Sequence, residues 1–140
     1  MYLDPSHDNV LALIERGIDG PVVMLNLLRF RAVADYSGHP DLAPDEPISG
    51  RAAYDRYIRH TLPFLEATGG SVALLGEGGH FFVGPVAERW DLALLVRQAS
   101  VEDFFSFAGN DDYLAGTGHR TAAVEDTRLL PLVDLPLPAQ

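Results

Sequence analysis

The stretch VVMLNLLRFR, residues 22–31, decides the fold of this chain. Alternate side chains of a β-strand lie on opposite faces, and both faces of this segment are apolar. One face holds Val22, Met24, Asn26, Leu28 and Phe30, and the other holds Val23, Leu25 and Leu27. A strand of this kind is buried on both sides, so we predict helices on one side and another layer on the other. The amide of Asn26 lies in the middle of this stretch, which Arg29 and Arg31 close, and the role of that amide has to be explained.

The rest of the sequence predicts a β-α-β-β-α-β order with an extra helix in front. That first helix follows Asp4-Pro5, Ser49 caps a helix that ends at Gly69-Gly70, and Ser100 caps a helix that ends at Gly109. We expect strands at 22–30, 71–83, 89–97 and 119–130. Gly76, Gly78 and Gly79 predict a bulge or break within the second strand. Residues 32–48 should form a long loop, which is a candidate lid. Residues 1–131 then form one domain, followed by a proline-rich tail at 132–140.

This order is that of the ferredoxin-like split βαβ fold, an α+β class. Right-handed crossovers give an antiparallel sheet ordered 4-1-3-2 with both main helices on one face. The other face is left bare, yet the first strand is apolar there as well. We therefore expect a homodimer in which two sheets pack face to face.

Composition excludes several classes of function. A net charge of −10 argues against binding to nucleic acids and to anionic membranes. The chain has no cysteine, and its ten basic residues are all arginine, which excludes thiolate and lysine Schiff-base chemistry. The five histidines show no metal-ligand spacing, so we expect neither a metal nor a cofactor. No run of 18 apolar residues and no secretory signal are present, and the expected location is cytoplasmic.

PVVMLNLLRFR, the helix that ends in two glycines, RWDLALLVRQAS and GHRTAAVEDTRLLPL together resemble a bacterial family of unknown function. That family belongs to the dimeric α/β-barrel superfamily, and the resemblance covers residues 4–131. The superfamily includes cofactor-free monooxygenases, haem-degrading enzymes, muconolactone isomerases and pure ligand binders. Some of its members use an Asn-Trp-His set, which Asn26, Trp90 and His119 resemble in residue type.

The predicted sheet brings polar side chains together at one edge. The end of the first strand should meet the starts of the third and fourth, so residues 30–48 lie near Trp90, Asp91, His119 and Arg120. The ligand-binding candidates are Asn26, Tyr54, Trp90, His119 and Arg120. No catalytic residue is identified, and His119 and Asp91 are the candidates for one.

Each candidate also has a structural interpretation. Asn26 could satisfy backbone groups, Trp90 and Tyr54 could be core residues, and His119 could be a capping or core contact. Arg120 could pair with Asp126 or Asp91 instead of a ligand, and we favour a structural or interface ion pair for Asp126 and Arg128.

The sequence leaves two functions open. The first is a homodimer that binds a small anionic or aromatic molecule at the Trp90, His119 and Arg120 end of the sheet. The second is a cofactor-independent oxygenase or isomerase that acts on a small aromatic or enolic substrate. The sequence does not decide whether the protein is an enzyme.

Overall fold

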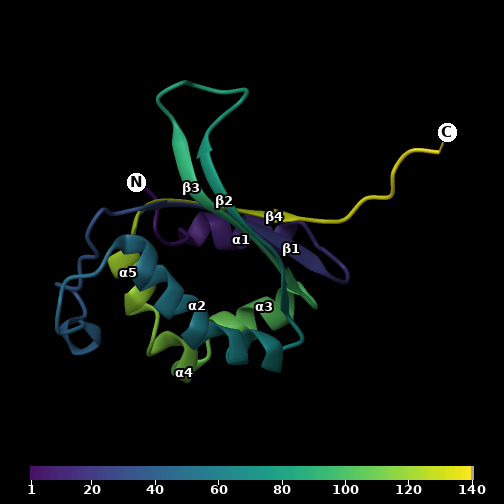
Figure 1. The fold of residues 1–140 in the computed structure, drawn as a ribbon. Coiled ribbons are helices and arrows are strands. Elements are labelled where there is room, and N and C mark those ends of the chain that lie inside the picture. The colour runs from purple at the N-terminus through teal and green to yellow at the C-terminus, as the bar shows by residue number, and fades with distance from the viewer. Residues whose placement is uncertain (140) are drawn as a thin grey trace.

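A four-stranded antiparallel sheet with helices on one side forms the molecule (Figure 1). The structure, a computed structural model, describes residues 1–139. The strands are β1 (Val22–Phe30), β2 (Ser71–His80), β3 (Arg89–Gln98) and β4 (Val124–Leu132). Their spatial order is β2-β3-β1-β4, which confirms the predicted order 4-1-3-2 and the ferredoxin-like α+β fold.

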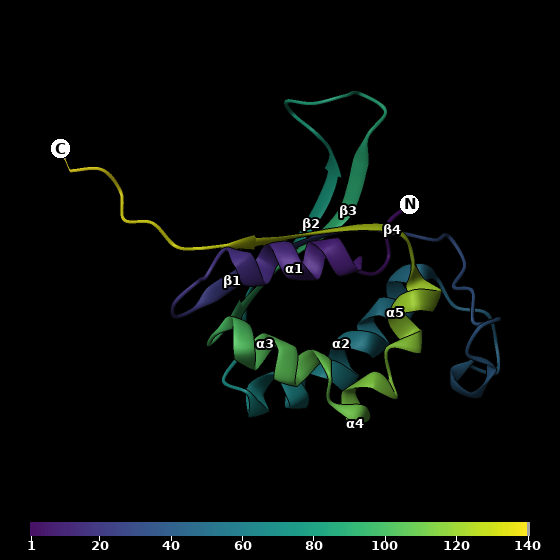
Figure 2. The ribbon, with the colours of Figure 1, turned by 180° about the vertical axis from the view of Figure 1, so that it is seen from behind.

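All helices lie on the same side of the sheet, as the two opposite views show (Figures 1 and 2). They are α1 (His7–Glu15), α2 (Gly50–Ala67), α3 (Val101–Ala108), α4 (Asp111–Leu114) and α5 (Gly118–Ala123), with a short 3₁₀ helix, η1 (Pro40–Leu42). Side chains of Ser49 and Ser100 accept backbone N–H groups at the starts of α2 and α3, as predicted. The helix α1 is capped by Ser6 rather than by Asp4.

The predicted division of β1 into two faces is correct. Leu28 and Phe30 pack with Tyr54 of α2 in the main core, while Val22 and Met24 pack with Val101 of α3. Asn26 therefore faces the helices. Because β1 pairs with β3 on one side and β4 on the other, it is the strand whose apolar sequence specifies the centre of the fold.

The predicted final strand at 119–130 is wrong at both ends. Residues 118–123 form α5 and the strand begins at Val124. Ala122 and Ala123 are fully buried, and alanine favours a helix over a strand. The strand also continues through Pro131, which is tolerated because β4 is an edge strand and the missing N–H faces away from its one neighbour.

Two smaller features of β2 also differ from the prediction. The strand ends at His80 rather than residue 83, and its register shifts between Val72 and Leu74 rather than at the glycines. Gly78 has a different role, because a Cβ at that position would collide with the backbone oxygen of Trp90. The glycine here permits close approach of β2 to β3.

The long loop between β1 and α2 docks on α5. Asp35 N donates to Ala122 O at 2.9 Å, and Ala34 N donates to Ile48 O at 2.9 Å. Tyr36 is buried in the main core. These contacts make the loop a packed cover on α5.

The sheet face opposite the helices carries no covering layer among residues 1–139 (Figure 2). Leu74 and Leu130 are exposed there, and Leu25 and Leu27 are half-buried. The hairpin between β2 and β3 rises from this side and carries Phe82, which is fully exposed (Figure 1). We call the outward-facing residues of the four strands the open face.

Candidate functional site

A cavity of about 410 Å³ lies between the sheet and the helices α2 to α5. We call it the central cavity. Most of its lining is apolar, including Met24, Leu94 and Val96 from the sheet. Its polar lining consists of Asp4, Asn26, Tyr54, Tyr57, Thr61, Gln98, Tyr113, Thr117, Arg120 and Thr121. An apolar cavity of this size with a few convergent polar groups is typical of a small-molecule site.

Asn26 lies on the sheet side of the central cavity. Its Nδ2 donates to Met24 O at 3.2 Å and to Leu94 O at 3.3 Å, so the amide nitrogen is engaged with the backbone. The structural interpretation of Asn26 accounts for its nitrogen, and its role in ligand binding stays a prediction. The nitrogen is held by the strands, and the side chain as a whole borders the cavity.

Three tyrosines contribute phenol groups. Tyr57 and Tyr113 share a hydrogen bond of 2.6 Å between their hydroxyls, while Tyr54 is almost fully buried. Burial raises the pKa of Tyr54 and of Tyr113, and the nearby positive charge of Arg120 acts weakly in the opposite direction. Tyr54 and Tyr113 therefore remain protonated at neutral pH, and one hydroxyl proton of the Tyr57–Tyr113 pair is used within that pair.

Arg120 lies at the end of the central cavity nearest the N-terminal arm, residues 1–5. Its Nη1 donates to Leu3 O at 2.8 Å, and Nη2 lies 3.4 Å from Thr127 Oγ1. Its nearest carboxylate is that of Asp4 at 3.9 Å, so it pairs with neither Asp126 nor Asp91. A guanidinium in this position supplies a positive charge at a mostly apolar cavity.

A second cavity of about 810 Å³ lies between α1 and β4, and we call it the lateral cavity. It shares Leu3, Asp4, Pro5, Phe104, Arg120 and Leu129 with the central cavity, so the N-terminal arm forms part of the wall between the two. The arm is anchored through Tyr2, whose N–H donates to Asp126 Oδ1 at 2.7 Å and whose carbonyl accepts from Thr127 N at 2.9 Å.

Sequence reasoning missed Thr61 and Gln98. Both are buried, and neither Thr61 Oγ1 nor Gln98 Oε1 has a hydrogen-bond partner within residues 1–139. A signal for them was present. Gln98 continues the inward series Leu92, Leu94 and Val96 of β3, and Thr61 continues the inward face of α2 after Tyr54 and Tyr57. A polar residue at an apolar position of a periodic pattern marks a buried polar group.

Trp90 and Asp91 line neither cavity. Trp90 packs beneath the guanidiniums of Arg29 and Arg128, at 4.5 and 5.1 Å from the ring centre. Asp91 Oδ2 accepts the backbone N–H of Phe30 at 2.8 Å. In this position Asp91 holds the end of β1 against β3.

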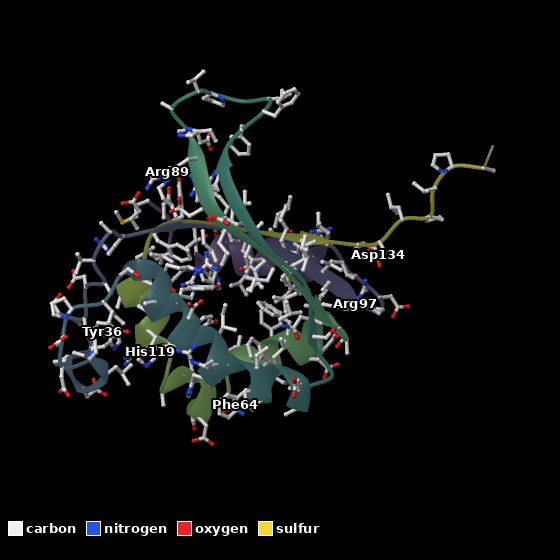
Figure 3. The ribbon with its side chains drawn as sticks, viewed as in Figure 1. Tyr36, Phe64, Arg89, Arg97, His119 and Asp134 are labelled. Atoms are coloured by element: carbon white, nitrogen blue, oxygen red, sulfur yellow. The ribbon has the colours of Figure 1, made fainter. Side chains whose placement is uncertain are left out.

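His119 lies on the outer side of α5. Its Nδ1 is 2.7 Å from the hydroxyl of Tyr36, and Figure 3 shows this pair far from Arg89 at the start of β3. Because residues 118–123 are helical, His119 and Arg120 point about 100° apart, His119 toward the loop and Arg120 toward the cavities. The expected cluster of Trp90, His119 and Arg120 therefore does not form.

The structure thus brings together three of the five predicted binding residues, namely Asn26, Tyr54 and Arg120. No residue of the loop at 32–48 lines either cavity, so the loop is not placed as a lid. The predicted Asp126–Arg128 ion pair is present, with Nη1 and Oδ1 2.8 Å apart.

Further searches of residues 1–139 give two negative findings. No group of three histidine or acidic side chains has an arrangement that could hold a metal ion. None of the helices in this part of the chain has the length and apolar character needed to cross a membrane.

Comparison with solved structures gives two strong matches. The RPA0582 protein of Rhodopseudomonas palustris, described as a protein of unknown function, is 34% identical, and the match covers 95% of this chain and 96% of that one at a TM-score of 0.80. The methylated RPA0582 protein matches at 34% identity over 99% and 98% of the two chains, with a TM-score of 0.84. A DABB-family protein with a ferredoxin-like fold from Mesorhizobium loti is 13% identical over 84% and 100% of the chains, with a TM-score of 0.47. No protein-family model and no curated protein matches the chain.

Proposed function

Since the chain belongs to the family of the RPA0582 protein, whose function is unknown, we propose its function from its own geometry. The protein binds a small amphipathic molecule in the central cavity, with the anionic group of the ligand at Arg120 and its apolar body along Met24, Leu94 and Val96. The observation that carries this proposal is an apolar cavity of about 410 Å³ with a guanidinium at one end.

Binding explains the cavity better than the alternative of proton-transfer catalysis. Of the described residues that line the central cavity, the one carboxylate is Asp4, whose side chain is 86% exposed. The two catalytic candidates, His119 and Asp91, lie outside it. The phenols of Tyr54 and Tyr113 do not act as bases at neutral pH, because burial raises their pKa.

Isothermal titration with octanoate tests this function. The wild-type protein should bind octanoate with one-to-one saturation. Ala108→Phe adds a ring to the cavity wall and should abolish binding, whereas Ala87→Phe in the exposed hairpin should leave it unchanged. Binding that survives Ala108→Phe in a folded protein would place the ligand elsewhere, and absence of binding to the wild type would refute the proposal.

We also propose that two copies associate through the open face. Leucines are exposed on both edge strands of this face, Leu74 on β2 and Leu130 on β4. The face also holds both signs of charge, with Arg29 and Arg128 beside Asp126. A surface that is apolar and charge-balanced is complementary to a second copy of itself. Light scattering should give about 30 kDa, twice the chain mass of 15.2 kDa.

A matched pair of variants tests this interface. Leu130→Arg places a charge in the open face and should yield a monomer. Leu11→Arg places the same charge on α1, at a comparably exposed leucine, and should leave the dimer intact. A monomeric wild type at micromolar concentration would refute the dimer.

A further inference from the structure

The lining of the central cavity contains two polar atoms that the protein itself does not satisfy. Gln98 is 1% exposed and Thr61 is 8% exposed, and Gln98 Oε1 and Thr61 Oγ1 find no partner among the described residues. A buried polar atom left unpaired destabilises the folded state, because its hydrogen bonds to water are lost without replacement. Two such atoms in the wall of one cavity indicate that its occupant supplies the missing hydrogen bonds.

These two residues lie at the opposite end of the central cavity from Arg120. Gln98 is paired with Val22 at the start of β1, whereas Thr127, which Arg120 approaches, is paired with Leu28 near its end. Six residues of strand separate these positions, about 20 Å between backbones.

The contacts of α2 place its two ends in the same way. The start of α2 lies against Arg31 at the end of β1, and Gly70, just after α2, packs near Arg97, which pairs with Val23 at the start of β1. Thr61 follows Tyr54 by two helical turns, about 10 Å, in the direction away from Arg120. Side chains from both ends reach into the cavity, so their polar groups lie closer together than the backbones do.

We propose that Gln98 and Thr61 form a second polar subsite, which binds a hydroxyl group at the far end of the ligand. This inference rests on the proposed function and narrows the ligand class to a hydroxylated acid with an apolar middle. A hydroxyl fits because it both donates and accepts, while Gln98 Oε1 only accepts and Thr61 Oγ1 does both. Arg120 then selects the acid group, and the second subsite selects the length of the molecule.

A comparison of octanoate with 8-hydroxyoctanoate by isothermal titration tests the second subsite. The two acids differ by one terminal hydroxyl, and the wild type should bind the hydroxy acid about tenfold more tightly. Gln98→Met and Thr61→Val should each reduce this preference severalfold while octanoate still binds. Thr68→Val, which changes a threonine that lines neither cavity, should retain the full preference.

The outcomes separate this inference from the proposed function. If neither acid binds, both are refuted. If the wild type binds both acids equally, the second subsite holds only ordered water and the inference alone is refuted. A preference that persists undiminished in both Gln98→Met and Thr61→Val would also refute it, and the wild-type comparison decides the matter even if one variant fails to fold.

Discussion

Replacement of Arg120 by methionine is the sharpest test of the central cavity. The substitution keeps an unbranched side chain of similar length but removes the guanidinium that lines both cavities. It also removes the 2.8 Å hydrogen bond from Nη1 to Leu3 O. The loss of that bond should lower the free energy of unfolding by about 1 kcal/mol.

The effect on binding should be larger. A hydrogen bond to a charged group contributes about 1.5–3 kcal/mol, which corresponds to a loss of about tenfold to 150-fold in the affinity for octanoate. The affinity for 1-octanol, which has no negative charge, should change much less. Isothermal titration of both molecules measures the difference.

Arg16→Met is the matched control. Arg16 also donates to a backbone oxygen at 2.8 Å, that of Pro131, and it lines the lateral cavity but not the central one. Both variants therefore lose an arginine and one arginine–backbone bond, and only Arg120→Met loses the charge at the central cavity. Equal octanoate affinity in Arg120→Met and in the parent protein would show that the acid group does not lie at Arg120.

Three further predictions concern the packing around the site. Gly50→Ala should lower the free energy of unfolding in urea by about 3 kcal/mol, because the new Cβ would collide with the backbone oxygens of Arg31 and Ala123. Gly38→Ala is the control and should be nearly neutral, because the space around Gly38 is open. Burial, with Arg56 and His60 nearby, lowers the pKa of His119, so the unfolded chain takes up this proton at a higher pH than the folded one. The free energy of unfolding in urea should therefore fall as the pH drops through and below 6.5, and His119→Phe should flatten that slope; an unchanged slope would show that another group causes it. Asn26→Leu removes two long hydrogen bonds together with the desolvation cost of an amide, so its free energy of unfolding in urea should stay within about 1 kcal/mol of the parent value. A loss of about 3 kcal/mol would show that the amide holds β1 to β3.

The sequence predicts most of the fold because its strongest signals are local. β1 has the bounds expected from its two apolar faces, and α2 and α3 begin after the serines that cap them. The segment 118–123 was misread because a short helix has too few residues to show a period, and its burial against α2 depends on distant residues.

The site was less predictable than the fold for a related reason. Topology alone placed Trp90, His119 and Arg120 at one edge, but that placement required residues 119 and 120 to be in a strand. One helical step sends their side chains in different directions. The central cavity also depends on where side chains leave space unfilled, which is a property of the packed structure rather than of any sequence pattern.

The proline in the edge strand β4 has a consequence for how these molecules can associate. An edge strand usually offers free N–H and C=O groups to another chain, and this exposes a protein to open-ended growth into fibrils. Pro131 has no N–H to offer, and its C=O is occupied by Arg16. At this edge the protein resists the addition of another strand, so contact between copies is directed away from strand addition at β4 and toward a closed, finite assembly.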